Sequence, residues 1–203
     1  LKGFVYVKSG ATLTIEAGSV IKGISVASGE RAASLIIEPG AKIIAEGTVD
    51  KPIVFTSDKE PGKRVTGDWG GLIICGNARV NRTNQPTIEG GPGTHYGNTT
   101  SDEFNGESSG KLKYVRIEFA GYPLEPDKEI NGLTFGGVGS GTEVEFVQVS
   151  YSNDDSYEWF GGTVNAKHLI AYKGWDDDFD TDYGYTGKLQ FLLSVRDKDI
   201  ADT

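Results

Sequence analysis

The C-terminal quarter of the chain carries carboxylates at a regular spacing. Residues 150–203 contain eleven Asp or Glu against five Lys or Arg, which accounts for six of the nine excess negative charges of the chain. Steps of 22 residues place acids in three files, meaning columns of side chains that stand 22 residues apart: Asp155, Asp177 and Asp199; Glu158, Asp180 and Asp202; Asp154 and Asp176. Carboxylates stacked at the spacing of neighbouring strands repel by about 1 kcal/mol per pair in water, so solvent screening or a bound cation must offset this repulsion.

Calcium is the cation that such hard oxygen ligands favour. One interpretation is therefore a calcium site built across neighbouring turns of the chain, with ligands from Asp154, Asp155, Glu158, Asp176, Asp177, Asp178, Asp180 and Asp182. The alternative is a solvated face of turn residues, because Asp bonds its own backbone in turns. An EF-hand loop opening at Asp178 is not supported, since Tyr183 replaces the required glycine and Leu189 replaces the bidentate glutamate.

Aromatic residues are interleaved with these acids. Exposed rings beside polar groups provide flat platforms for sugars, whereas rings inside a β-structure are ordinary packing. Trp159 and Trp175 depart from the 22-residue pattern, and we predict that a ligand binds at Trp159, Trp175, Tyr183 and Tyr185. Tyr157 and Phe179 are 22 residues apart, and we expect them to form a structural stack.

No set of residues identifies a catalytic centre. A lyase would need an Arg or Lys base beside the carboxylates, but Arg116 falls in the file of Gln148 and Ile170, away from the acids. Lys173 and Arg196 lie closer in register, yet neither has a spacing that separates it from a structural ion pair. Hydrolysis by two carboxylates stays open only because acids are abundant.

The remaining reactive residue types give little support for other chemistry. The two histidines, His95 and His168, are far apart in sequence, and His168 falls in the file of Phe146 and Gln190. Cys75 is the only cysteine, which argues against a zinc site and excludes an internal disulfide. We expect it to be an inert thiol packed in the coil. No helical pattern follows the glycines of 136–141, so a phosphate-binding loop is not indicated.

The element that must position these side chains is a repeat of about 22 residues. The segment 13–18 returns as 35–40, and Val147 and Val149 recur as Leu169 and Ala171, then as Phe191 and Leu193. Apolar residues alternate over short runs bounded by Gly, Asn and Asp, as in Leu13/Ile15, which indicates strands. The period survives three insertions, at about 57–68, 82–111 and 123–131.

A fixed displacement of side chains favours a β-solenoid over a β-sandwich, because only a coil places each residue above its equivalent one turn earlier. We therefore predict an all-β fold, a right-handed parallel β-helix with about 22 residues per coil, forming a single domain over 1–203 with lateral loops. Val147, Leu169 and Phe191 would form one inner file of the core, and Val149, Ala171 and Leu193 another.

Several segments resemble a largely uncharacterised family of secreted or surface-anchored β-helix proteins of Bacteroidetes-type bacteria. The segments that carry this resemblance are 67–72 (GDWGGL), 114–121 (YVRIEFAG), 132–142 (GLTFGGVGSGT), 158–165 (EWFGGTVN) and 176–184 (DDDFDTDYG). The resemblance covers most of the chain from about residue 9. It implies a pectate-lyase-like solenoid and an extracellular or outer cell-surface location, and it brings no catalytic residue.

Composition narrows the function further. A net charge of −9 argues against nucleic acid as a partner, and no apolar run approaches the roughly 18 residues that span a bilayer. Methionine is absent, and the sequence stops at Thr203 in mid-repeat, so we expect either a fragment of a longer chain or an end covered by another copy. The leading hypothesis is an extracellular protein that binds glycan or another surface ligand. The alternatives are a polysaccharide lyase or hydrolase and a subunit of an extracellular filament that associates end to end.

Overall fold

The computed structural model describes residues 1–26, 32–90, 93–125 and 128–200, and within these it contains strands and no helix. The strands are β1 (Phe4–Val7), β2 (Thr12–Ile15), β3 (Val20–Gly23), β4 (Ser34–Ile37), β5 (Lys42–Glu46), β6 (Ile53–Ser57), β7 (Gly71–Cys75), β8 (Gly110–Glu118), β9 (Pro123–Glu125), β10 (Lys128–Glu129), β11 (Leu133–Gly136), β12 (Glu143–Ser150), β13 (Tyr157–Phe160), β14 (Asn165–Tyr172), β15 (Asp180–Asp182) and β16 (Leu189–Val195). No helix of the described residues is therefore long and apolar enough to cross a membrane.

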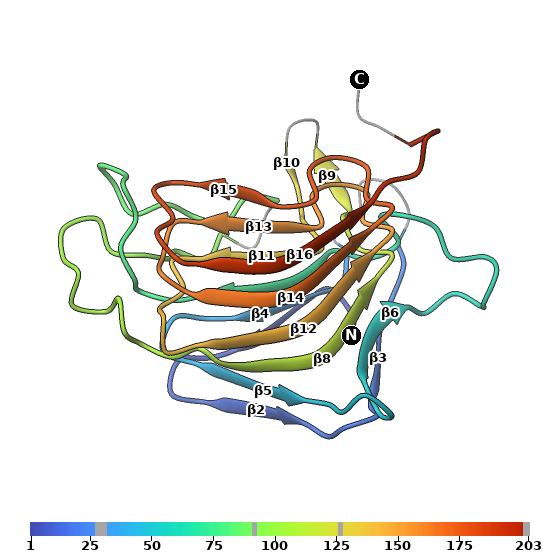
Figure 1. Cartoon of the computed structure of the whole chain (residues 1–203), viewed down its shortest axis with the longest axis horizontal. Helices are drawn as coiled ribbons and strands as arrows, with labels where there is room; N and C mark the ends of the chain where they lie inside the picture. Colours follow the sequence, from blue (N-terminus) through green and yellow to red (C-terminus); the bar gives the residue numbers. More distant parts are fainter. Residues whose placement is uncertain (27–31, 91–92, 126–127, 201–203) are drawn as a thin grey trace.

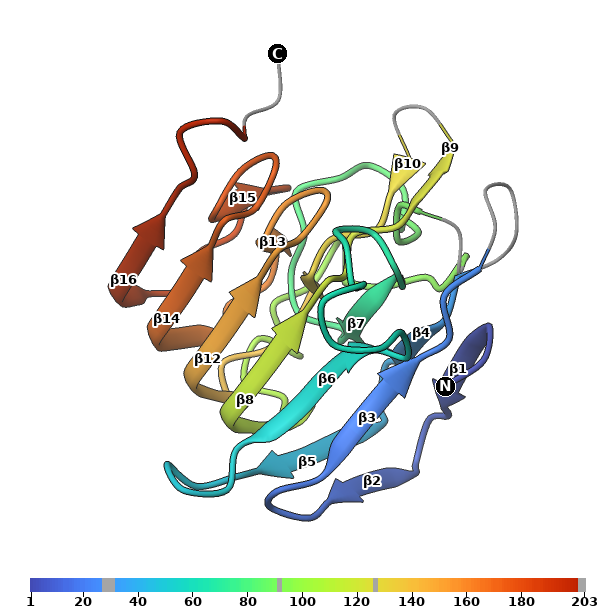
Figure 2. The same cartoon turned by 90° about the vertical axis from the view of Figure 1, so that its right-hand side faces the viewer.

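Two parallel sheets face each other across the core. Sheet A has the order β1-β4-β7-β11-β13-β15, and sheet B has the order β16-β14-β12-β8-β5-β2, with β3 and β6 joined to it through β8. Each turn of the chain adds a strand to sheet A and then to sheet B, so the strands stack in order (Figure 1; Figure 2). Only the hairpin of β9 and β10 pairs antiparallel within the described sheets. The fold is a right-handed parallel β-helix, as the sequence predicted.

The 22-residue step is confirmed where β14 lies on β12. Val147 pairs with Leu169 and Val149 pairs with Ala171. The prediction fails in the last coil, where Leu169 pairs with Leu192 and Ala171 with Ser194. Phe191 and Leu193 are therefore not members of the inner files. The corner after β15 holds one residue more than the corner after β13, and a shift of one residue turns every side chain of a strand to the other face.

The similarity between segments 13–18 and 35–40 does not mark one turn of the helix. Leu13 pairs with Ile43 in sheet B, whereas Leu35 pairs with Val5 in sheet A, and both displacements are 30 residues. The two segments are the same strand-and-turn pattern used at different corners. Local sequence likeness reports the local conformation, and the larger displacement arises because the first coils carry an additional strand in sheet B.

The core between the sheets is buried and partly aromatic. Phe135 stacks on Trp159 with ring centroids 5.5 Å apart, and Tyr157 stacks on Phe179 at 5.2 Å, as predicted. The single hydroxyl proton of Tyr157 is shared between the carbonyl oxygens of Val147 and Ile170, so the buried phenol is satisfied by two successive coils of sheet B.

The two sheets differ in what covers their outer faces. The long connection 76–109 packs Val80, Ile88 and Tyr96 against Ile73 and Cys75, which closes a second apolar cluster on the outside of sheet A. Cys75 is fully buried in this cluster and not inside the coil as expected, and burial raises the pKa of its thiol. The outer face of sheet B is instead hollowed, with Tyr114, Phe146 and Phe191 among the residues that line one hollow.

Candidate functional site

The predicted acids meet at one corner of the helix, where the chain passes from sheet B to sheet A. The turn between β12 and β13 supplies Asp154 and Asp155, and the turn between β14 and β15 supplies Asp176. Glu158 of β13 pairs directly with Asp180 of β15, so this part of the predicted stacking is confirmed. We call these five residues the acidic corner.

The carboxylates of the acidic corner form two overlapping triads. Asp154, Asp155 and Asp176 each bring one oxygen within 4.8 Å of the other two, and Asp155, Glu158 and Asp180 do the same. The backbone of the next coil stabilises the arrangement, because the amide of Asp177 donates to Oδ1 of Asp155 at 2.9 Å. Oxygens this close can share one cation, since Ca²⁺ takes oxygen ligands at roughly 2.3–2.6 Å.

Burial makes these carboxylates difficult to ionise together. Asp155 and Glu158 are each 8% exposed, and burial, with the neighbouring carboxylates next, raises the pKa of Asp154 to about 7, of Asp155 to about 8 and of Glu158 to about 10. The pKa of Asp180 is raised mainly for the same reason. Among the ion pairs of the described residues, none involves Asp154, Asp155, Glu158 or Asp180. Protons or a bound cation would offset the repulsion among these four carboxylates at neutral pH.

One buried amide belongs to this corner. Asn131 is 4% exposed, and its Nδ2 donates to Oε2 of Glu158. Its Oδ1 is buried without a hydrogen-bond partner. The amide oxygen is a further hard ligand atom beside the triad of Glu158, although Asn131 was not among the predicted residues.

Three predicted metal ligands lie outside both triads. The side chain of Asp177 is exposed, Asp178 accepts from Ser194 and faces Arg196 at 3.6 Å, and Asp182 is exposed at the far end of β15. The outer members of the predicted files do not extend the corner either. Asp199 forms a surface ion pair with Lys198, and Asp202 lies outside the described residues.

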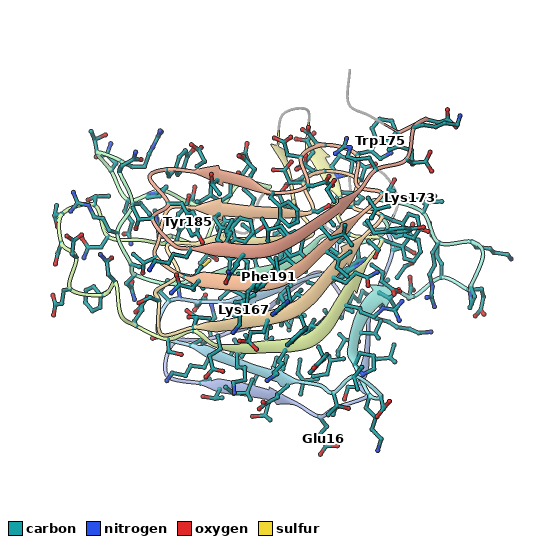
Figure 3. The ribbon with its side chains drawn as sticks, in the orientation of Figure 1. Glu16, Lys167, Lys173, Trp175, Tyr185 and Phe191 are labelled. Atoms are coloured by element: carbon teal, nitrogen blue, oxygen red, sulfur yellow. The ribbon has the colours of Figure 1, made fainter. Side chains whose placement is uncertain are left out.

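The four predicted aromatic residues do not form one surface. Trp159 is fully buried in the core, so its prediction as a ligand platform is wrong; its place in β13 points it inward. Tyr185 packs against the end of the same core, and its hydroxyl donates to the carbonyl of Val164. Tyr183 packs outside sheet A, between Phe160 and Arg82. Figure 3 shows Tyr185 on the left side of the molecule and Trp175 on the right side.

Trp175 is the predicted aromatic residue that reaches solvent, with 41% of it exposed. It lines a hollow of about 490 Å³ together with Arg64, Phe119 and Tyr151. The rings of Phe119 and Tyr151 are stacked, with centroids 5.1 Å apart. We call this space the Trp175 hollow. It lies beside the acidic corner, because Asp176 follows Trp175 in the same turn.

Sequence reasoning missed a second aromatic feature on the outer face of sheet B. Tyr114, Phe146, His168 and Phe191 stack one above the next, with centroid distances of 4.7, 4.5 and 4.7 Å. All four have a positive φ, between 50° and 60°, which turns each side chain out of the regular alternation of its strand. We call them the ring ladder. Phe191, and not Gln190 as predicted, lies above His168.

A signal for the ring ladder was present in the sequence. Each ring directly precedes an inward aliphatic residue, as in Phe146-Val147 and His168-Leu169, so two apolar or aromatic residues stand where a strand should alternate. That irregularity, recurring in successive coils, is typical of a bulge. The ladder lines a hollow of about 500 Å³ that also contains Arg116 and Gln148, and we call it the ladder hollow.

The basic residues considered for catalysis are engaged elsewhere. Arg116 does pair in register with Gln148 and forms an ion pair with Glu118. Lys173 pairs with Asp197 at 2.9 Å, and Arg196 donates to backbone carbonyls of the turn at Trp175. Arg196 reaches a triad only through the backbone carbonyl of Asp176, and no ion pair among the described residues joins Arg116, Lys173 or Arg196 to a triad carboxylate.

Comparison with known protein families identifies the family to which the chain belongs. The family model for a pectate-lyase like beta helix domain matches residues 1–202. The chain belongs to this family. No curated protein matches the sequence, and no solved structure matches it either. Membership in the family accounts for the stacked parallel sheets and names no ligand for this chain.

Proposed function

We propose that this chain is an extracellular or cell-surface β-helix protein that binds glycan and holds calcium at the acidic corner. The observation that carries the glycan proposal is the Trp175 hollow, where an exposed indole lies beside two stacked rings and the guanidinium of Arg64. Concave sites with apolar walls and a few polar groups are the usual form of small-ligand sites, and amphipathic rings suit the apolar faces of sugars. The family relationship to pectate-lyase-like domains supports a polysaccharide as the ligand class.

Binding to a panel of neutral and acidic polysaccharides tests this function. We expect at least one polymer to bind, and Trp175→Ala to weaken that binding by about tenfold, the effect of losing roughly 1.4 kcal/mol at an aromatic contact. Phe104→Ala is the matched control, because Phe104 is an aromatic residue of similar exposure (37%) in the connection 76–109. Equal weakening by both variants, or no binding by the native chain, would contradict the proposal.

Calcium at the acidic corner is the second part of the proposal. Its support is the convergence of carboxylate oxygens, of which those of Asp155 and Glu158 join no ion pair among the described residues, next to the buried Oδ1 of Asn131. A cation that binds only the folded chain raises its melting temperature. We expect millimolar Ca²⁺ to raise the melting temperature at pH 8 by several degrees, and Asp155→Asn to abolish the increase because Asp155 belongs to both triads.

Asp182→Asn is the matched control for calcium, since Asp182 is an exposed acid of the same region that joins neither triad. This variant should retain the full increase in melting temperature that Ca²⁺ causes in the native chain. A melting temperature that does not respond to Ca²⁺, or that responds equally in the two variants, would argue against a cation at this corner.

A polysaccharide hydrolase is the second candidate function, favoured by carboxylates within 4.8 Å whose pKa values are raised unequally. Paired carboxyl groups with separated pKa values are the requirement for acid–base cleavage of a glycosidic bond. Release of reducing ends from the bound polymer, lost in Asp155→Asn, would establish this activity. Binding without release of ends would leave the protein a binding module.

A further inference from the structure

We propose that a linear polysaccharide lies along the outer face of sheet B, in a continuous trough that joins the ladder hollow to the Trp175 hollow. This inference rests on the proposed glycan binding and adds its location and the shape of the ligand. None of the ring-ladder residues was predicted from the sequence as a ligand-binding residue, so the trough is not the site formed by the four predicted aromatic residues.

The trough is continuous because neighbouring hollows have lining residues in common. A middle hollow of about 360 Å³ shares Arg116 and Gln148 with the ladder hollow. The same middle hollow shares Arg64, Phe119 and Tyr151 with the Trp175 hollow. Each hollow therefore opens beside the next across the same face. In Figure 3 Phe191 lies over the middle of the strands, while Lys173 and Trp175 lie at their C-terminal end.

The trough runs in the direction of the strands. Tyr114 and Arg116 are outward residues of β8, and Phe119 directly follows that strand. Five residues of extended chain span about 17 Å, and the Trp175 hollow extends the path further. A single sugar would occupy only one of the three hollows. An extended polymer of several sugars matches the shape.

The lining has the chemistry that a glycan chain needs. Phe191 is 60% exposed and Phe146 is 36% exposed, so the ladder contributes apolar surface. Arg116, Gln148 and Arg64 contribute donors for hydroxyl or carboxylate oxygens. Arg64 donates to the carbonyl of Lys59 and to Thr56, and it forms no carboxylate ion pair among the described residues.

Sheet B is the face on which such a polymer has access. The connection 76–109 packs against the outside of sheet A, whereas sheet B keeps Phe146 of β12 and Phe191 and Leu193 of its edge strand β16 exposed. Charge does not oppose an acidic sugar either. The three hollows are lined by two arginines and one glutamate, although the chain as a whole carries a net charge of −9.

The test uses calorimetry with oligosaccharides of increasing length, prepared from the polysaccharide that binds best in the panel. We expect affinity to rise with length and then to level off once the oligomer spans the trough. Phe191 and Trp175 lie at opposite ends of the trough. Phe191→Ala and Trp175→Ala should each weaken the binding of a long oligomer by roughly five- to tenfold. A short oligomer should respond to only one of the two variants. Phe104→Ala is again the control, and circular dichroism verifies that each variant is folded.

The outcomes separate this inference from the function on which it rests. Loss of binding in Trp175→Ala with unchanged binding of every oligomer in Phe191→Ala would overturn the trough and leave glycan binding in place. Affinity that does not depend on length beyond one or two sugars would also overturn it. Failure of the native chain to bind any polysaccharide would overturn the proposed function itself, and the trough with it.

Discussion

Asp155 belongs to both carboxylate triads, and its environment shows how a single residue governs the acidic corner. Its Oδ1 accepts from the amide of Asp177, and its carboxylate lies near four other acids. Burial is the largest cause of its raised pKa, with Asp154 the next. Without a cation, ionisation of this corner opposes folding, because the ordinary carboxyl pKa is near 4 in the unfolded chain.

The pH dependence of stability can be derived from these shifts. The folded pKa values of Asp154 and Asp155, about 7 and about 8, exceed their unfolded values, so between about pH 4 and pH 8 the folded chain binds more protons. The stabilisation is complete below the unfolded pKa and is lost as pH rises through the folded values. With a chelator present, we expect the melting temperature to fall by several degrees between pH 5 and pH 8.5.

Differential scanning calorimetry at fixed ionic strength measures this effect. The fall of the melting temperature with rising pH should be smaller in Asp155→Asn, whose amide does not titrate. It should be unchanged in Asp182→Asn. A melting temperature that rises over the same interval would show that the corner is not the dominant titrating group.

At the scale of single elements, the entry to β8 shows how backbone conformation fixes the trough. Gly110 begins β8 with φ at +118°, and a Cβ at this position would lie 1.9 Å from the carbonyl oxygen of Ile43. The strand therefore joins β5 only because position 110 has no side chain. β8 carries Tyr114 and Arg116, so the placement of the ladder depends on this contact.

Gly110→Ala should therefore destabilise the fold. We expect the free energy of unfolding to fall by about 3 kcal/mol, because both the φ angle and the backbone contact oppose a methyl group. Gly106→Ala is the control, since nothing lies within 4 Å of a Cβ there and its φ is not in the left-handed region. Chemical denaturation of both variants measures the difference, and similar losses would contradict the explanation.

At the scale of the whole molecule, the two ends of the described coil leave strand edges unpaired. Among the described strands, β16 pairs only with β14, and at the other end β1, β2 and β3 each pair on one side. Leu192 near one end is 39% exposed and Val20 near the other is 59% exposed. Unpaired edges with apolar side chains favour association with another chain.

We accordingly expect the 203-residue chain to self-associate end to end as its concentration rises. Size-exclusion chromatography with light scattering over a wide range of concentration measures this. Leu192→Lys and Val20→Lys should each reduce association if the contact is head to tail, because each end contributes one half of the interface. A monomer at every concentration would contradict the prediction.

The sequence by itself determined the repeat and the local stacking that the repeat imposes. The 22-residue step placed Val147 on Leu169, Tyr157 on Phe179 and Glu158 on Asp180, because side chains of successive coils are held in register by backbone hydrogen bonds. Such files can be read from the sequence as long as every corner has the same length. One additional residue after β15 was enough to shift Leu192 and Ser194 into the places expected for Phe191 and Leu193.

Only the tertiary structure decided which of the candidate residues act together. Trp159 and Trp175 both stand among acidic residues in the sequence. Trp159 points from strand β13 into the core, whereas Trp175 lies in the turn after β14 and lines a hollow. Asn131 reaches Glu158 from 27 residues away, and Arg64 lines the same hollow as Phe119 and Tyr151, which are still further away in the sequence. The connection 76–109 packs on the outer face of sheet A. These are long-range packing outcomes, set by the balance of buried surface over the whole fold, and no local period encodes them.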